Sequence, residues 1–249
     1  MSPYSPPEAG NTKNYGIIAE NEKARRAMKA YQTEFIDFML RAGVLTFGDF
    51  TTKSGRKTPY FVNTGNYRTG SQIAALGDYY AAAIQESGEE VDALFGPAYK
   101  GIPLAVAAAS SLYRLYGRDL PYCFNRKEAK DHGEGGRLIG HKPKTGERLA
   151  IIEDVVTAGT AVRETVALFE AEAEVSFAAL FVSVDRMERG TGEKSAIQEL
   201  RETLGLRVYP IVTVREIMAH LRGREIGGKV VLTEELYKRT EDYLARYGV

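Results

Sequence analysis

Hydrophobic and polar residues follow helical spacing near the start of the chain and strand-like spacing directly after it. Over residues 20–42 the apolar side chains recur at helical intervals opposite a charged face, which predicts a helix that caps the body. The stretch LTFGDFTTKSGRKTPYFVNTG alternates aromatic with polar residues around Gly and Pro, so we expect two short strands joined by a turn. Residues 71–87 then predict a helix that ends at Gly88.

Beyond Gly88, apolar runs alternate with helical patterns. Continuous apolar strands that alternate with helices are typical of a parallel sheet covered on both faces. The pattern therefore predicts one α/β domain over residues 31–249, preceded by an N-terminal extension over residues 1–30. The predicted strands are VDALFG, PYCFN, RLAIIED, FAALFVSVD and LRVYPIV, and the predicted helices are IPLAVAAASSLYRLYG, residues 160–173 and the segments after the last strand.

The composition is that of an ordinary globular protein. Of 249 residues, 44% are hydrophobic and 27% are charged, and 33 basic side chains balance 33 acidic ones, which gives no support to a general nucleic-acid binder. Cys123 is the one cysteine, which excludes an intrachain disulfide. Because the chain contains no apolar run long enough for a bilayer and its start lacks the apolar core of a signal peptide, we expect a cytoplasmic protein that binds no membrane.

Polar and glycine-rich stretches follow four of the predicted strands. In a parallel sheet the carboxyl ends of the strands share one edge, and ligands bind outside that edge. We therefore expect a ligand site built from these stretches, which are GPAYKG, NRKEAKDHGEGGR, EDVVTAGTA and DRMERG.

The stretch EDVVTAGTA combines two carboxylates with a small, hydroxyl-bearing turn that leads into a helix. The N–H groups of such a turn favour a phosphate, and Thr157 and Thr160 add hydroxyl donors. Carboxylates repel phosphate, so Glu153 and Asp154 must face another part of the ligand, such as the hydroxyls of a ribose 5-phosphate, directly or through a metal. The alternative is a solvated loop in which Thr160 caps the helix.

The same stretch resembles the phosphoribosyl diphosphate (PRPP) motif of type I phosphoribosyltransferases. From about Tyr31 onward, the segments KSGRKTPYF, FGPAYKGIPLA, YCFNRKEAKDHGEGG, EDVVTAGTA and DRMERG are similar, in order, to the orotate phosphoribosyltransferase family. This resemblance implies the type I fold, with a central mostly parallel sheet flanked by helices, a small hood from N-terminal elements and a mobile lid loop. It also implies transfer of the 5-phosphoribosyl group from PRPP to orotate, giving orotidine 5'-monophosphate and pyrophosphate in de novo pyrimidine (UMP) biosynthesis.

The resemblance also implies roles for individual residues. Catalysis is assigned to Lys130, Asp154, Arg126 and His132, and the lid over residues 126–137 is expected to close over the substrate and exclude water. The alternative for this mixed-charge run is a solvated loop without a ligand. PRPP binding is assigned to Lys53, Tyr99, Lys100, Arg126, Lys127, Lys130, His132, Glu153, Asp154, Val155, Val156, Thr157, Ala158, Gly159, Thr160 and Ala161. Without a ligand, Tyr99 would only pack.

Orotate binding is assigned by resemblance to Phe61, Val62, Thr157 and Arg186, with Arg186 presenting a bidentate fork to the orotate carboxylate. Two positions differ from the common family pattern: this chain has Val62 where a second aromatic residue is often found, and Glu153 where an aspartate is frequent. Mg²⁺ is expected through PRPP, with no protein ligand assigned directly and Asp154 able to reach it. The resemblance further implies a homodimer that shares the lid across its interface.

Two other functions remain open at this point. A PRPP-sensing regulator would tolerate loss of the lid cations, which this chain keeps, and a nucleic-acid regulator should show a basic face. A purine or uracil phosphoribosyltransferase would need a different base pocket, whereas Arg186 in DRMERG favours an acidic base.

Overall fold

A six-stranded sheet forms the centre of the structure, which is a computed structural model that describes residues 28–249 except 53–54, 128–136, 173 and 191. The predicted positions Lys53, Lys130 and His132 lie outside the described residues. The strand order is β5-β4-β3-β6-β7-β8, and all neighbours are parallel except the antiparallel pair β4 and β5. The strands are β3 (Ala93–Gly96), β4 (Tyr122–Asn125), β5 (Leu138–Gly140), β6 (Arg148–Glu153), β7 (Ser176–Asp185) and β8 (Val208–Thr213). The expected α/β architecture is confirmed.

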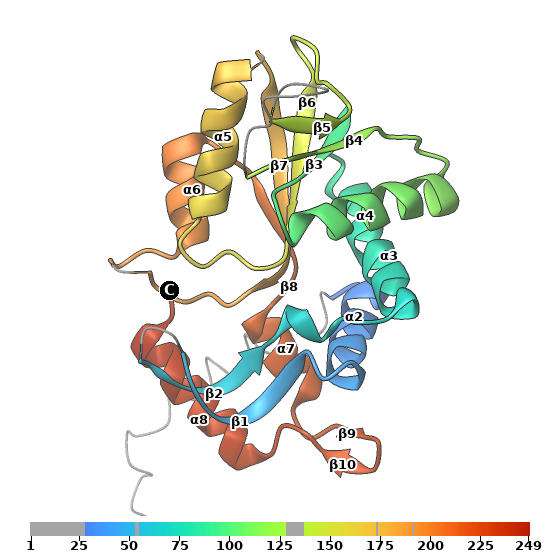
Figure 1. The fold of residues 1–249 in the computed structure, drawn as a ribbon. Helices are drawn as coiled ribbons and strands as arrows, with labels where there is room; N and C mark the ends of the chain where they lie inside the picture. The colour runs from blue at the N-terminus through green and yellow to red at the C-terminus, as the bar shows by residue number, and fades with distance from the viewer. Residues whose placement is uncertain (1–27, 53–54, 128–136, 173, 191) are drawn as a thin grey trace, which may run out of the picture.

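Helices cover both faces of this sheet. Helices α3 (Gly70–Ser87) and α4 (Gly101–Tyr116) lie on one face, and α5 (Thr160–Glu172) and α6 (Ala196–Leu204) lie on the other (Figure 1). Neighbouring strand residues belong to different cores: Ala150 and Ile152 pack on the α3 and α4 side, whereas Leu149 and Ile151 pack on the α5 and α6 side. Two-sided burial therefore explains why the strands are continuous apolar runs.

A hood lies at the carboxyl ends of the strands, and segments from the early and the last part of the described chain build it (Figure 1). Strands β1 (Leu45–Thr51) and β2 (Lys57–Val62) form an antiparallel hairpin, and α8 (Glu234–Tyr247) packs against β2, with Tyr60 edge-on to Tyr243 at 6.0 Å between ring centroids. The expectation of a hood from N-terminal elements is therefore incomplete. Helices α2 (Ala30–Arg41) and α7 (Val214–Leu221) pack together beside it.

Several elements were not predicted. Strand β5 lies in a polar stretch after the lid, α6 follows the DRMERG loop, and a short helical turn, η1 (Thr64–Asn66), follows β2. Strands β9 (Glu225–Ile226) and β10 (Lys229–Val230) form a small hairpin of two-residue strands, too short for a periodic pattern. No helix in the described part of the chain is long and apolar enough to cross a membrane.

A glycine sets the close approach of α3 to α4. A Cβ atom added at Gly77 would lie 2.6 Å from the backbone oxygen of Ala107, a distance that requires one helix to move. By contrast, a Cβ atom at Gly70, the first residue of α3, meets nothing within 4 Å.

We expect Gly77→Ala to lower the free energy of unfolding by about 1–3 kcal/mol, because the overpacked contact outweighs the better helix propensity of alanine. Gly70→Ala is the matched control in the same helix and should leave stability unchanged or slightly raised. Urea unfolding followed by circular dichroism measures both. Equal stability of the two variants would show that the α3–α4 distance does not depend on Gly77.

Candidate functional site

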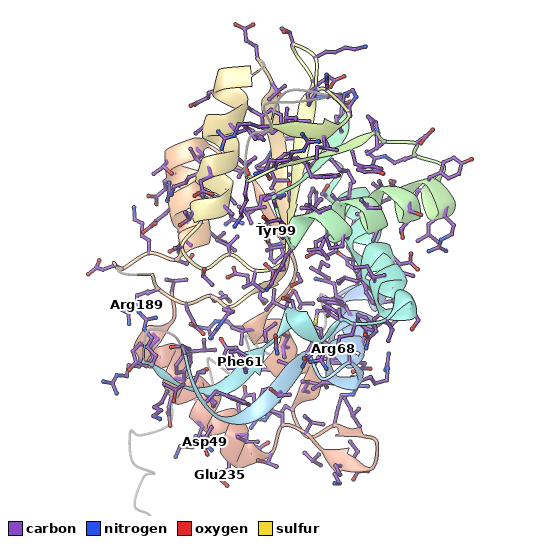
Figure 2. All side chains as sticks on the ribbon, viewed as in Figure 1. Asp49, Phe61, Arg68, Tyr99, Arg189 and Glu235 are labelled. Atoms are coloured by element: carbon purple, nitrogen blue, oxygen red, sulfur yellow. The ribbon has the colours of Figure 1, made fainter. Side chains whose placement is uncertain are left out.

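A cavity of about 720 Å³ lies between the hood and the carboxyl ends of the strands. Its walls come from β2, from the turn after β6, from the loop after β7 and from the start of α6. Figure 2 shows Phe61 on the hood and Tyr99 at the facing end of the sheet. The predicted residues that line the cavity are Phe61, Val62, Lys100, Asp154, Val155, Val156, Thr157, Ala158 and Arg186.

Asp154 is an ionised carboxylate at the wall of this cavity. Its Oδ2 accepts hydrogen bonds from Lys100 Nζ and from Thr64 Oγ1, both at 2.7 Å. Burial pushes its pKa upward, but the hydrogen bonds from Lys100 and Thr64 outweigh burial and hold the pKa of Asp154 below its usual value. The sequence did not indicate Thr64 as a partner, because the contact spans 90 residues.

Glu153 differs from its neighbour in both position and charge. Only 9% of the residue is exposed, and it is not among the residues that line the cavity. Burial raises the pKa of Glu153 to about 8, although its Oε1 accepts a hydrogen bond from the Asp154 N–H at 3.0 Å. The structure places Asp154 at the cavity and leaves Glu153 buried at the end of β6, and the ligand contacts of both carboxylates stay predictions.

The turn after Asp154 has the shape of an anion site. Val155 N–H donates to Asp154 Oδ1 at 2.8 Å, and α5 begins at Thr160, so Gly159 rather than Thr160 occupies the capping position. Gly159 has a φ of +71°, and an added Cβ atom would lie 3.3 Å from Leu200. The first N–H groups of a helix lack intrahelical partners and favour negative charge, which suits the predicted phosphate. Gly159, Thr160 and Ala161 are not among the residues that line the cavity.

The GPAYKG turn connects β3 to α4 beside the base of the lid. Tyr99 is 68% exposed, so it does not simply pack into the core, and Lys127 Nζ lies 5.1 Å from the centroid of its ring. The Arg126 N–H donates to the Arg137 carbonyl at 2.8 Å, which continues the β4–β5 pairing into the lid. Tyr99, Arg126 and Lys127 do not line the cavity, and a ligand contact for them stays a prediction.

Arg186 lies at the other side of the cavity, and one edge of its guanidinium is bonded to Glu188. Its Nε and Nη2 donate to Glu188 Oε1 at 3.0 and 2.7 Å, and Tyr60 OH donates to the same oxygen at 2.6 Å. Phe61 stacks on Phe50 with ring centroids 5.5 Å apart. The sequence analysis missed Glu188 and Tyr60, although the spacing of Arg186 and Glu188 within one loop could have indicated the pair.

Arg56 is a further residue that the sequence analysis missed. It lines the cavity, and its Nη1 and Nη2 donate to the carbonyls of Arg189 and Gly190, both at 3.0 Å. The hood is thus tied to the loop after β7 by contacts that span more than 130 residues. No local pattern could reveal such a pair.

Comparison with known proteins shows which family this chain resembles over most of its length. Residues 63–201 match the model of the phosphoribosyl transferase domain family. The chain is 52% identical over 222 residues to the orotate phosphoribosyltransferase of Clostridium beijerinckii, covering 89% of this chain and 99% of the relative. It is 53% identical over 223 residues to that of Lachnoclostridium phytofermentans, with the same two coverages. The crystal structure of orotate phosphoribosyltransferase from Francisella tularensis matches with a TM-score of 0.77 at 36% identity, covering 87% of this chain and 100% of that one.

The raised pKa of Glu153 generates a prediction about pH. Because the folded-state pKa of about 8 exceeds the ordinary value of 4.5, the unfolded chain releases this proton first as the pH rises. Relative to Glu153→Gln, the unliganded wild-type protein should therefore lose free energy of unfolding between about pH 4.5 and pH 8, by at most about 1.4 kcal/mol per pH unit. Urea unfolding at pH 5, 6.5 and 8 measures the difference.

Asp92→Asn is the control for this series. Hydrogen bonds from Arg148 lower the pKa of Asp92 to about 2 in the folded protein. Asp92 is therefore ionised in both the folded and the unfolded chain at all three pH values. The difference in free energy of unfolding between Asp92→Asn and wild type should not change with pH. A constant difference for Glu153→Gln as well would contradict a protonated Glu153.

Proposed function

The chain belongs to the orotate phosphoribosyltransferase family, and on that premise we propose that it transfers the 5-phosphoribosyl group from PRPP to orotate. The products are orotidine 5'-monophosphate and pyrophosphate, and the reaction is a step of de novo pyrimidine biosynthesis. Because of that pathway, we propose that the enzyme is cytoplasmic. The observation that carries the proposal is a single cavity with the Asp154 turn on one side and Arg186 on the other. Residues 31–249 form the catalytic domain and residues 1–30 an extension.

PRPP lies with its 5-phosphate in the turn of residues 155–161 and its ribose toward Asp154. The N–H groups of the turn and the start of α5 supply donors for the phosphate, and the ionised Asp154 accepts from the ribose hydroxyls. Lys100 Nζ forms a salt bridge with Asp154 Oδ2. When PRPP enters, Lys100 is free to exchange this contact for the pyrophosphate.

The reaction breaks the bond from the anomeric carbon to pyrophosphate and forms a bond from that carbon to an orotate nitrogen. Positive charge develops on the sugar and negative charge on the departing pyrophosphate, so cations near the leaving group stabilise the transition state. The lid supplies Arg126, Lys127, Lys130 and His132 for this role. Closure of the lid also excludes water, which would otherwise intercept the sugar cation.

Orotate lies on the hood side of the cavity. Arg186 binds its carboxylate, Thr157 donates to the ring, and Phe61 with Val62 provides an apolar face. Purines and uracil lack the carboxylate, so the cationic Arg186 favours orotate over those bases.

Asp154 would be the residue able to reach Mg²⁺ carried by PRPP. It fits the preference of Mg²⁺ for carboxylate, phosphate and water oxygens, because it is held as a carboxylate at the cavity wall. When bound, the ion would supply positive charge for the departing pyrophosphate.

We further propose that the enzyme is a homodimer whose partner subunit covers the outer face of α4. Val106 and Tyr113 lie two helical turns apart on that face and are 37% and 63% exposed, and Tyr122 on the neighbouring strand β4 is 39% exposed. Helix α4 packs against β4, which leads into the lid. A second copy on this face therefore lies next to the base of the lid, which suits a lid shared between subunits.

The proposed reaction is tested by absorbance of the purified protein with orotate, PRPP and Mg²⁺, with uracil and hypoxanthine assayed in parallel. We expect loss of orotate that requires both PRPP and Mg²⁺, together with at least 100-fold slower use of the other bases, on the order expected for an unpaired charged group. Tight PRPP binding without turnover of any base would favour a PRPP-sensing regulator instead.

Tyr113→Glu should convert the dimer into a monomer of half the mass, because it places a charge in an apolar interface. Leu204→Glu is the control, since Leu204 is an exposed apolar residue at the end of α6, on the other side of the sheet. Size-exclusion chromatography with light scattering measures the mass. An unchanged mass for Tyr113→Glu would move the interface away from α4.

Mixing two impaired variants reveals whether the lid acts on the partner subunit's site. Lys130→Ala damages the lid and Arg186→Ala damages the orotate pocket, so a mixed dimer has one intact site only if the lid crosses the interface. At low orotate concentration, co-refolded variants should then regain part of the wild-type turnover. If mixed dimers form but regain no turnover, each lid serves the site of its own subunit.

A further inference from the structure

Three hydrogen-bond donors converge on one carboxylate oxygen beside the cavity. Glu188 Oε1 accepts from Arg186 Nε at 3.0 Å, from Arg186 Nη2 at 2.7 Å and from Tyr60 OH at 2.6 Å. The side chains of Arg186 and Glu188 are 16% and 14% exposed, so water weakens these contacts less than it would at the surface. The guanidinium also lies over the Tyr60 ring, with its carbon 5.2 Å from the ring centroid.

These contacts use one edge of the Arg186 guanidinium. The edge formed by Nε and Nη2 faces Glu188, whereas Nη1 and the second N–H of Nη2 form the other edge. Only that second edge can bind the carboxylate of a ligand through two parallel hydrogen bonds. Glu188 therefore determines which edge of Arg186 is presented to the cavity.

We propose that Glu188, held by Tyr60, is a positioning residue that aims Arg186 at the carboxylate of orotate and so contributes to the choice of base. This inference rests on the proposed function and adds two residues to it. Tyr60 is buried beneath Arg186 and does not line the cavity, whereas Glu188 lines it and is proposed to act through its contact with the guanidinium.

The opposite role for Glu188 is that of a counter-ion that orotate displaces from Arg186. The backbone around Glu188 argues against it, because the loop is fixed on both sides. Arg189 N–H donates to the Tyr247 carbonyl at 2.8 Å, Val249 N–H donates to the Met187 carbonyl at 3.0 Å, and Glu188 forms a β-bridge with Gly248.

Within the loop itself, Met187 holds a positive φ of +52°, and its N–H donates to Asp185 Oδ1 at 2.7 Å. A residue in this left-handed conformation is set by its surroundings rather than by its own preference. With its backbone fixed and Tyr60 bonded to its carboxylate, Glu188 is a rigid brace for Arg186 rather than a group that swings away.

The test compares steady-state kinetics of Glu188→Ala, Glu188→Gln and Tyr60→Phe with wild type, after the wild-type assay has established turnover of orotate. Glu188→Ala should raise the KM for orotate about tenfold, the size of one hydrogen bond to a charged group. Its kcat and its KM for PRPP should stay within about twofold of wild type. Glu188→Gln and Tyr60→Phe should raise the KM for orotate less than Glu188→Ala does. Arg186→Ala gives the largest increase in this KM that loss of positioning could cause.

A double-mutant cycle separates positioning from two independent contacts. If Tyr60 acts through Glu188, then Tyr60→Phe should add little to the orotate KM of Glu188→Ala. Additive increases would contradict the proposed link between the two residues.

The chain offers a matched control with the same three residue types. At the opposite end of the sheet, Glu89 accepts from Tyr209 OH at 2.5 Å and pairs with Arg207 at 2.7 Å. Glu89→Gln and Tyr209→Phe remove similar bonds away from the cavity and should leave both KM values unchanged.

Each outcome distinguishes this inference from the proposed function. A lower orotate KM in both Glu188 variants would overturn the inference in favour of a displaceable counter-ion. Equal increases in the KM values for orotate and PRPP, with a lower melting temperature, would reduce Glu188 to a structural role. If wild type itself fails to use orotate, the proposed function fails before the variants are compared.

Discussion

Burial of the central sheet on both faces is the constraint on which the rest of the structure depends. Strands such as β6 have apolar residues on both sides, so charged side chains that face a ligand are expected where a strand ends. Because parallel strands end at one edge, that constraint gathers Lys100, Asp154 and Arg186 around one cavity from distant parts of the sequence. The location of the chemistry therefore follows from the packing of the core.

The end of β6 shows how burial also divides two adjacent carboxylates. Glu153 is the last strand residue and stays buried, which favours its protonated form, whereas Asp154 emerges at the cavity and keeps its charge beside Lys100. In the proposed reaction, this arrangement would leave one negative charge at the cavity wall to accept hydrogen bonds from the ribose, with less repulsion of the phosphates than two charges would cause.

The hood forms one wall of the cavity and joins the β1–β2 hairpin to the C-terminal helix α8. Tyr60 from β2, Arg56 beside it and the residues after α8 all contact the loop that carries Arg186. Contacts from the hairpin and from the C-terminal helix therefore meet at this loop, in which Met187 has a left-handed backbone conformation.

The sequence by itself determined the α/β class, most helices and strands, and the four stretches at the strand ends, since these follow from local periodicity and from motifs of adjacent residues. It also placed Asp154, the turn after it and Arg186 at one edge of the sheet, because each lies directly after an apolar strand, and the structure brings them to one cavity. Only the tertiary structure decided that Glu153 is buried, that the C-terminal helix completes the hood and that Glu188 with Tyr60 holds Arg186. The physical reason is distance along the chain: Tyr60 and Glu188 lie 128 residues apart, and their contact depends on how the core packs rather than on any local pattern.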